Sequence, residues 1–262
     1  MTRVIAVCNQ KGGVGKTTTS VNLAASLSTA DCATLLVDLD PQANATSSLG
    51  FMASQIEQGR GDIYDALSGD VPVADLILDT ALPNLKLLPS STELVGAELE
   101  LATASNRERR LESCLAPILS RFQIVLIDSP PSLGILTLNA LTAADSVLIP
   151  LQTEYMALEG VASLMRTIGL VRQNLNPRLE VEGLLLTMCD PRNNLSNQVA
   201  DEARAHFQGL VFRSVIPRNV RLSEAPSHGK PVLLYDVSSK GALSYLQLAG
   251  ELLERMKKDG YT

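Results

Sequence analysis

A glycine-rich segment with two lysines constrains this 262-residue chain more than any other feature. The apolar run Val4–Cys8 predicts a buried strand, and the pattern over Thr17–Thr29 predicts a helix. Between them, residues 9–19 read Asn-Gln-Lys-Gly-Gly-Val-Gly-Lys-Thr-Thr-Thr. A strand, a glycine-rich loop and a helix in this order predict a phosphate-binding loop. The glycines let backbone N–H groups turn toward an anion, and the helix N-terminus adds partial positive charge.

The remaining pattern alternates short strands with longer helices. Strands are expected at Val4–Cys8, Thr34–Asp38, Leu85–Pro89, Ile124–Asp128, Ser146–Pro150, Glu182–Thr187 and Val211–Ile216. Helices are expected near Thr17–Thr29, Asn106–Arg121, Leu133–Ala143, Leu158–Gln173, Ser196–Phe207 and Leu243–Lys257, with short surface helices in Gly50–Asp79. This alternation predicts an α/β fold, a mostly parallel twisted sheet flanked by helices. No linker divides the chain, so we expect a single domain over residues 1–262.

Composition excludes several classes of protein. With 45% hydrophobic and 19% charged residues, the chain is not disordered, and its scarce aromatic residues argue against a platform for stacking single-stranded nucleic acid. The net charge of −6 gives no overall attraction for nucleic acid, but residues 1–150 carry −7 and residues 151–262 carry +1, which places any basic patch in the second half. The four cysteines form no paired motif, and no signal or membrane-spanning run is present, so we expect a cytoplasmic protein.

The residues of the loop itself point to a nucleoside phosphate and magnesium. Lys16 can reach the outer phosphates, and the Thr17 hydroxyl can ligate a magnesium ion. The strict GxxxxGK[ST] pattern fails because Gln10 takes the first glycine position, and an additional lysine, Lys11, follows it. The alternative is a flexible turn with a solvated lysine, which the flanking strand and helix disfavour.

Acidic residues follow two of the expected strands, where α/β sheets place their sites. Asp38 and Asp40 alternate, so we expect them on the same side of the chain, one to hold a magnesium-bound water and the other to orient an attacking water. The alternative for Asp40 is a turn residue before Pro41. Asp128 ends the apolar run Ile124–Asp128 and would bind magnesium through water.

The motif Lys-Gly-Gly-Val-Gly-Lys-Thr-Thr-Thr resembles the deviant Walker A motif of the ParA/MinD ATPases, P-loop NTPases related to the nitrogenase iron protein. The resemblance implies ATP and Mg²⁺ as cofactors and an ATP-bound homodimer in which Lys11 reaches the partner's phosphates. It implies Lys11, Lys16 and Asp40 as catalytic residues, Lys11, Gly12, Gly13, Val14, Gly15, Lys16, Thr17 and Thr18 as nucleotide-binding residues, and Thr17 and Asp128 as magnesium-binding residues. Asp40 would orient the hydrolytic water.

The polar stretch Ser214–Pro231 predicts a long loop. It closely resembles a segment of chromosomal ParA/Soj-type partition proteins, which implies that Pro217 and Asn219 contact adenine. The resemblance also implies non-specific double-stranded DNA binding by the ATP-bound dimer, association with the nucleoid, and a ParB-type centromere-binding partner that accelerates hydrolysis. Candidate DNA-binding residues are Arg192, Arg218 and Arg221. The alternatives are a plain turn residue at Asn219 and a solvated face for the arginines.

The match has departures: Ala43 and Ser48 stand where the family usually has glycine, and residues 30–33 replace its usual turn. One alternative is a MinD-like or cargo-positioning ATPase on a membrane or the nucleoid. In the amphipathic stretch Leu243–Lys257, two glutamates interrupt the basic face, so we expect a packed helix and no membrane binding. Another alternative is an iron–sulfur reductase, but this chain lacks the pair of cysteines that such an enzyme needs to hold its cluster. A third alternative is a small-molecule kinase or synthetase, whose turnover would depend on an acceptor substrate.

Overall fold

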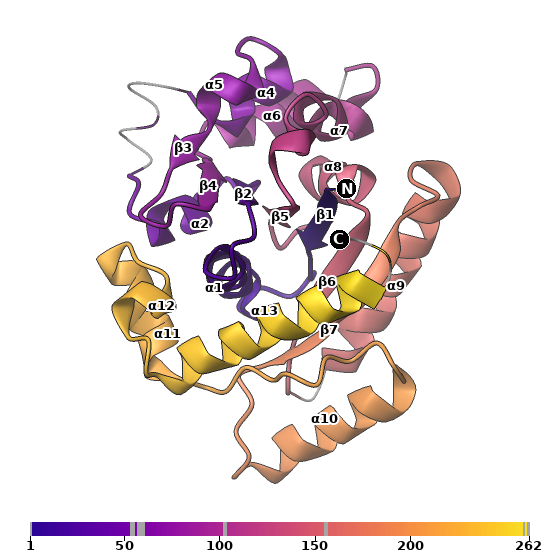
Figure 1. Cartoon of the computed structure of the whole chain (residues 1–262). Helices are drawn as coiled ribbons and strands as arrows, with labels where there is room; N and C mark the ends of the chain where they lie inside the picture. The colour runs from indigo at the N-terminus through magenta and orange to yellow at the C-terminus, as the bar shows by residue number, and fades with distance from the viewer. Residues whose placement is uncertain are drawn as a thin grey trace.

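The computed structural model describes residues 2–52, 56, 61–101, 104–154, 157–258 and 260 (Figure 1). Its strands are β1 (Arg3–Val7), β2 (Thr34–Asp38), β3 (Leu78–Asp79), β4 (Leu85–Leu88), β5 (Ile124–Asp128), β6 (Ser146–Gln152) and β7 (Glu180–Thr187). They form one seven-stranded sheet in the order β3-β4-β2-β5-β1-β6-β7. Every neighbouring pair is parallel except β3 and β4. The predicted fold class, a mostly parallel sheet flanked by helices, is therefore confirmed.

Helices cover both faces of the sheet. In chain order they are α1 (Lys16–Ser28), α2 (Asn44–Ser48), α4 (Ile63–Ser68), α5 (Val73–Leu76), α6 (Leu94–Leu101), α7 (Arg110–Leu115), α8 (Ile135–Ala143), α9 (Ala157–Asn174), α10 (Asn194–His206), α11 (Val220–Glu224), α12 (Val232–Tyr235) and α13 (Lys240–Lys258). Short 3₁₀ turns are η1 (Arg107–Arg109), η2 (Leu119–Arg121) and η3 (Ala225–His228).

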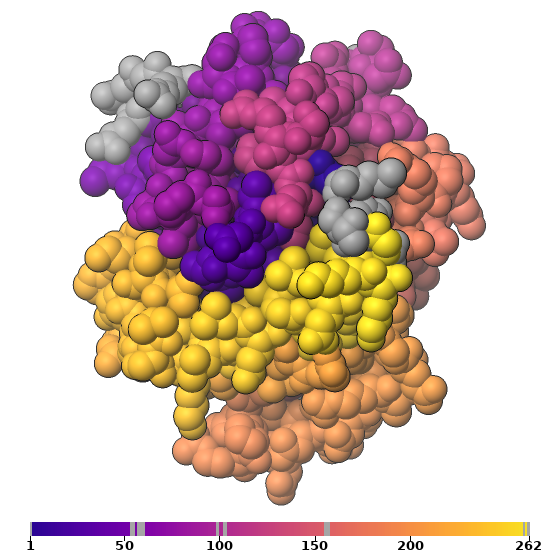
Figure 2. Space-filling model, viewed as in Figure 1, coloured from indigo at the N-terminus to yellow at the C-terminus, as the bar shows by residue number. Residues whose placement is uncertain are grey.

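The central strand β1 shows how the core is divided. Val4 and Ala6 pack with the apolar side chains of α7, α8 and α9, whereas Ile5 and Val7 pack with those of α1 and α13. Successive side chains of a strand point to opposite faces, so a strand buried on both faces must be apolar throughout. Figure 2 shows the yellow surface of α13 lying along the indigo surface of the N-terminal part of the chain.

Six of the seven strands expected from sequence are confirmed, but Val211–Ile216 is not a strand. This segment runs beside β7 and forms only isolated bridges, Leu184 with Val211 and Cys189 with Pro217. Phe212 N donates to Leu184 O, but the next donor to β7 is Ile216 N rather than Ser214 N. The pairing breaks because Ser214 N donates to the Glu251 side chain instead.

Three other expectations need correction. The helix expected at Asn106–Arg121 is divided into η1, α7 and η2, and Pro117 lies at the break because proline cannot donate a helical hydrogen bond. The polar loop expected at Ser214–Pro231 contains α11 and η3. Within Gly50–Asp79, residues 53–55 and 57–60 lie outside the described residues. The described remainder contains α4, α5 and β3, so the expected short helices are present, but each also buries apolar side chains in the core.

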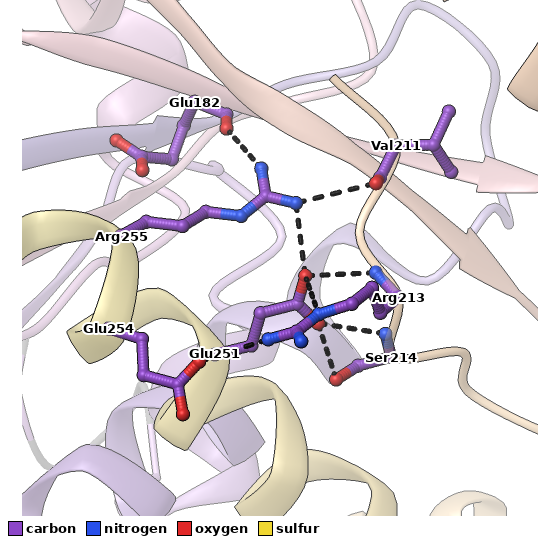
Figure 3. Close-up of polar contacts among 7 residues, drawn as sticks. All are labelled: Glu182, Val211, Arg213, Ser214, Glu251, Glu254 and Arg255. Carbon is purple, nitrogen blue, oxygen red and sulfur yellow. Dashed lines mark hydrogen bonds and ion pairs between the residues drawn. The ribbon is translucent and has the colours of Figure 1, made fainter. Parts of the chain in front are cut away.

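A buried carboxylate fastens α13 to this irregular segment (Figure 3). The Glu251 side chain, 5% exposed, accepts hydrogen bonds from the backbone N–H groups of Arg213 (2.9 Å) and Ser214 (2.8 Å) and from the Ser214 hydroxyl (2.8 Å). Arg255 donates to Glu251 at 3.0 Å and also to the carbonyl groups of Glu182 and Val211. Burial alone would raise the pKa of Glu251, but these donors lower it from 4.5 to about 2.

We expect Glu251→Gln to lower the free energy of unfolding at pH 7 by about 2–3 kcal/mol, because a neutral amide leaves buried donors without a charged acceptor. Since the folded-state pKa is depressed, the contribution of Glu251 is fully present above pH 4.5 and is lost as the pH falls toward 2. Urea unfolding of both proteins at pH 7 and at successively lower pH measures this difference.

Glu254→Gln is the matched control, because its side chain is 65% exposed and pairs with Arg213 at 3.0 Å. An exposed ion pair contributes less than about 1 kcal/mol, so the control should unfold much like the unaltered protein. Equal losses in the two variants would contradict the assigned role of Glu251.

Candidate active site

The loop between β1 and α1 has the geometry of an anion-binding cradle. Gly13 (φ 75°) and Gly15 (φ 89°) adopt the left-handed conformation that glycine reaches without strain. Lys11 N donates to Asn9 Oδ1 at 3.0 Å, and Asn9 Nδ2 donates to Pro150 O at 2.7 Å, which ties the loop to β6. Helix α1 starts at Lys16 without a side-chain cap, so its first N–H groups are available to a ligand.

The two lysines of the loop have different environments. Lys16 is 7% exposed, and its ammonium group lies 3.4 Å from the Lys11 carbonyl oxygen. Burial lowers the pKa of Lys16, and the negative charges of Asp128 and Asp40 act in the opposite direction. The Lys11 side chain is 45% exposed and lies 3.0 Å from Glu154. One cation therefore points into the chain's own site, and the other lies at the surface.

The sheet aligns the acidic residues at its carboxyl edge. Asp38 pairs in register with Asp128, and Asp128 pairs with Val7, the residue that ends β1. Asp38 and Asp128 are both fully buried. Burial raises the pKa of each carboxyl group above its usual range; the charge of Asp38 raises that of Asp128 further, and the charge of Asp40 adds to the rise at Asp38. This edge therefore favours a cation between the strands.

Asp38 and Asp40 differ in what they already hold. Asp38 accepts hydrogen bonds from Thr46 N and Thr46 Oγ1, both at 2.8 Å, and from Asp40 N at 3.2 Å. Both of its oxygens thus accept hydrogen bonds within the chain, and Asp38 anchors the start of α2. Asp40 is 6% exposed, and its Oδ1 accepts from Gln42 N at 3.0 Å.

The departure at Ala43 has a structural consequence. Ala43 adopts φ 50°, a left-handed conformation that is unusual for any residue with a Cβ atom, and its N–H group donates to Asp40 O at 2.9 Å. The tight turn beside Asp40 is therefore kept although alanine replaces the usual glycine.

Asp128 has the features of a cation ligand. Its Oδ1 accepts from Ser20 Oγ at 2.7 Å, whereas its Oδ2 is buried and has no hydrogen-bond partner among the residues that the structure describes. The Thr17 hydroxyl is close enough to lower the pKa of Asp128. Buried polar atoms without a partner are rare, and a bound ion with its water is one common explanation. The residues present therefore fit a magnesium ion at this position.

A cavity of about 480 Å³ adjoins the loop and α1. Its lining includes Gly15, Thr18, Thr187, Met188, Ile216, Pro217, Arg218, Asn219, Val220 and Tyr245. The structure thus places Pro217 and Asn219 next to the phosphate loop, although about 200 residues separate them from it in the sequence. Asn219 also has the turn role considered above, because its Oδ1 accepts from Arg221 N at 2.9 Å and starts α11.

Sequence reasoning missed three residues of this cavity. Thr187 ends β7 and donates to Val14 O at 2.8 Å, so the rule that sites follow strand ends could have found it. Met188 has φ 52°, a strained conformation that leaves no mark in the sequence. Tyr245, from α13, is buried and lies 3.2 Å from Thr19 Oγ1. Only the packing of α13 on α1 brings it there.

The three arginines are exposed and largely paired with carboxylates. Arg192 pairs with Asp190 at 3.1 Å, and Arg221 pairs with Glu224 at 2.8 Å and Asp236 at 3.3 Å. Arg218 N donates to Cys189 O, which places Arg218 beside the same loop as Arg192. The structure therefore brings Arg192 and Arg218 close together, and ion pairs within the protomer offset the charges of Arg192 and Arg221.

Helix α13 is packed, as expected. Tyr245, Leu248, Leu252 and Met256 are buried against the sheet and α1. Within the described ranges, we find no helix with the length and hydropathy that a bilayer-spanning segment requires.

Comparisons with known proteins agree with this geometry. A family model described as an AAA domain matches residues 2–181. The chain is 55% identical over 253 residues to the chromosome partitioning protein ParA of Myxococcus xanthus, covering 97% of this chain and 88% of the relative. It is 53% identical over 252 residues to the sporulation initiation inhibitor protein Soj of Bacillus subtilis, covering 96% and 98%.

A solved structure extends the comparison to bound ligands. It is described as cobyrinic acid a,c-diamide synthase from Mycobacterium smegmatis with a bound ATP analogue and magnesium. The chain is 40% identical to it, with a TM-score of 0.85 and coverage of 99% of this chain and 97% of that one. With more than half of its residues identical to ParA and Soj proteins over nearly its full length, the chain belongs to the ParA/Soj family of P-loop ATPases.

Proposed function

We propose that this ATPase is a dimerisation switch for chromosome or plasmid partitioning. Its ATP-bound homodimer would bind double-stranded DNA non-specifically on the nucleoid, and slow hydrolysis would release it. The observation that carries the proposal is the different exposure of the two lysines in the phosphate loop. Lys16 is buried in the chain's own site, whereas the Lys11 ammonium lies at the surface, where a second protomer's nucleotide can approach it. We further propose that residues 1–262 act as one ATPase domain.

The nucleotide would lie across the loop and the adjoining cavity. The N–H groups of residues 12–18, with Lys16, would bind the phosphates, and Pro217 and Asn219 would contact the adenine. Thr17 and Asp128 would hold magnesium, which neutralises phosphate charge when bound. Magnesium is commonly bound by one carboxylate, a hydroxyl group, phosphates and water, which agrees with the single unpartnered oxygen of Asp128.

Asp40 would orient the water that attacks the γ-phosphate, while Lys16 and the partner's Lys11 would stabilise the charge that develops on the transferred group. Asp40 suits this role better than Asp38, because both oxygens of Asp38 are engaged by Thr46 and the backbone.

DNA binding would come from Arg192, Arg218 and Arg221. Because each protomer offsets much of this charge with its own carboxylates, one copy would bind DNA weakly, and a dimer would present twice as many cations to the phosphates. A ParB-type partner would accelerate hydrolysis. This last step rests on the family resemblance alone.

Replacing Lys11 tests the dimer. We expect Lys11→Ala to bind ATP but to remain at the 28.0 kDa mass of one chain in light scattering, whereas the unaltered protein doubles its mass with ATP and not with ADP. Lys257→Ala, which removes an exposed charge on α13, should dimerise normally. Undiminished dimerisation by Lys11→Ala would refute the proposal.

Asp40→Ala should retain ATP binding and the dimer but lose at least about 100-fold in hydrolysis, because no group orients the water. Phosphate release with excess ATP measures this, and DNA co-sedimentation should show a persistent complex. Asp201→Ala, on the exposed side of α10, is the control and should hydrolyse ATP normally. Rapid turnover by Asp40→Ala would assign the water to another group.

Arg221→Ala should weaken DNA binding by the ATP-bound dimer about 3- to 10-fold for all sequences. Because each protomer would then bind one DNA phosphate fewer, the slope of log affinity against log salt should fall by about 2. Fluorescence anisotropy at several salt concentrations measures both values. The control is Arg172→Ala, an exposed cation near the end of α9, and an identical effect of the two variants would place the DNA surface elsewhere.

The synthase description of the Mycobacterium smegmatis structure favours a second candidate, ATP-dependent amide formation on the same scaffold. The higher identity to ParA and Soj favours the switch. Turnover that requires an acceptor carboxylate and an amine or ammonia, rather than DNA, would favour the synthase instead.

A further inference from the structure

The surface lysine of the phosphate loop is held by a carboxylate of its own chain. Lys11 Nζ lies 3.0 Å from Glu154 Oε2, and the two side chains are 45% and 48% exposed. The pair joins the loop that follows β1 to the segment that follows β6, the neighbouring strand. In the single protomer the Lys11 ammonium group is therefore paired with the segment that follows β6.

Glu154 is itself held in place for this contact. Its N–H group donates to Gln152 O at 2.8 Å, and its Oε1 accepts a hydrogen bond from the Gln152 side-chain amide. One carboxylate oxygen therefore binds the end of β6, and the other binds Lys11. The backbone of Lys11 meanwhile stays in the phosphate loop through Asn9. The pair can therefore open by movement of the Lys11 side chain while its backbone stays in place.

We propose that Glu154 is a positioning residue that holds Lys11 in the single protomer and must release it before Lys11 can reach a neighbouring nucleotide. The inference rests on the proposed dimerisation switch. It adds that Glu154 competes with the second protomer's nucleotide for the Lys11 ammonium group. An exposed ion pair is weak enough for the concentrated negative charge of a triphosphate to displace it, yet each dimer must break two such pairs. Glu154 would therefore set how much nucleotide-bound protein is needed before dimers form.

Glu154→Gln tests this role, because the amide keeps the shape and the Gln152 contact but removes the charge. With a non-hydrolysable ATP analogue and magnesium, we expect the Kd for dimerisation to fall about 2- to 30-fold, the range for two exposed pairs. The affinity of the monomer for ADP should stay within about 2-fold. Analytical ultracentrifugation and titration with a fluorescent ADP measure the two quantities.

Salt provides a readout that a merely structural role would not change. Exposed ion pairs are screened over a Debye length of about 3 Å at 1 M salt, so the difference between Glu154→Gln and the unaltered protein should shrink as salt rises. Glu159→Gln is the matched control. Glu159 is exposed on α9 and lines the same small groove as Glu154, but no ion pair joins it to Lys11 among the described residues.

The outcomes separate the two proposals. If the unaltered protein stays monomeric with the analogue, the dimerisation switch is wrong and the role of Glu154 falls with it. If the unaltered protein dimerises and Glu154→Gln leaves the Kd unchanged or raises it, only the role of Glu154 is wrong. An equal shift in Glu159→Gln would also overturn it, because the effect would then come from general charge around the groove.

Discussion

The site depends on three parallel strands whose ends lie at the same level. Because β1, β2 and β5 are in register, Asp38 and Asp128 lie next to each other and beside the start of the phosphate loop. Two buried carboxyl groups repel each other and are costly without a cation nearby. The Lys16 ammonium supplies one positive charge, and the unpartnered oxygen of Asp128 leaves room for a second. The buried carboxyl groups that the sheet brings together therefore favour nearby positive charge, which Lys16 and a magnesium ion can supply.

The wall of the cavity beside the phosphate loop is joined to this centre by two contacts. Val232 N donates to Asn22 Oδ1 on α1 at 2.7 Å. Gly229 packs so closely on Gly50 that a Cβ atom at Gly229 would lie 2.6 Å from the Gly50 Cα atom. The segment that carries Pro217 and Asn219 is therefore joined both to the phosphate-loop helix and to the segment that follows Asp40.

The charged surface follows a similar principle of partial compensation. Arg192 and Arg221 each pair with a carboxylate of their own chain, as Lys11 does with Glu154. Exposed pairs of this kind contribute little to stability and are easily exchanged for another anion. In the proposed switch, these cations would exchange their carboxylate partners for phosphates of a nucleotide or of DNA.

The sequence by itself determined the elements and the chemistry near strand ends. Largely apolar runs of five or six residues correctly predicted six strands, and the glycines and lysines of residues 9–19 predicted the phosphate loop, because both signals are local. The strand expected at Val211–Ile216 failed for a non-local reason, since Glu251 from α13 takes the hydrogen bond that a strand would have used. Helix α13, which carries Glu251, also brings Tyr245 to the cavity.

Tertiary structure alone decided which groups meet. The spacing alone did not distinguish Asp38 from Asp40, and only the tertiary structure shows that Asp38 accepts two hydrogen bonds from Thr46. The positive φ of Met188, the pairing of the arginines and the hold of Glu154 on Lys11 likewise depend on residues distant in the chain. Local sequence patterns encode backbone conformation and burial, but hydrogen bonds and ion pairs between distant segments are set by how the sheet and helices pack.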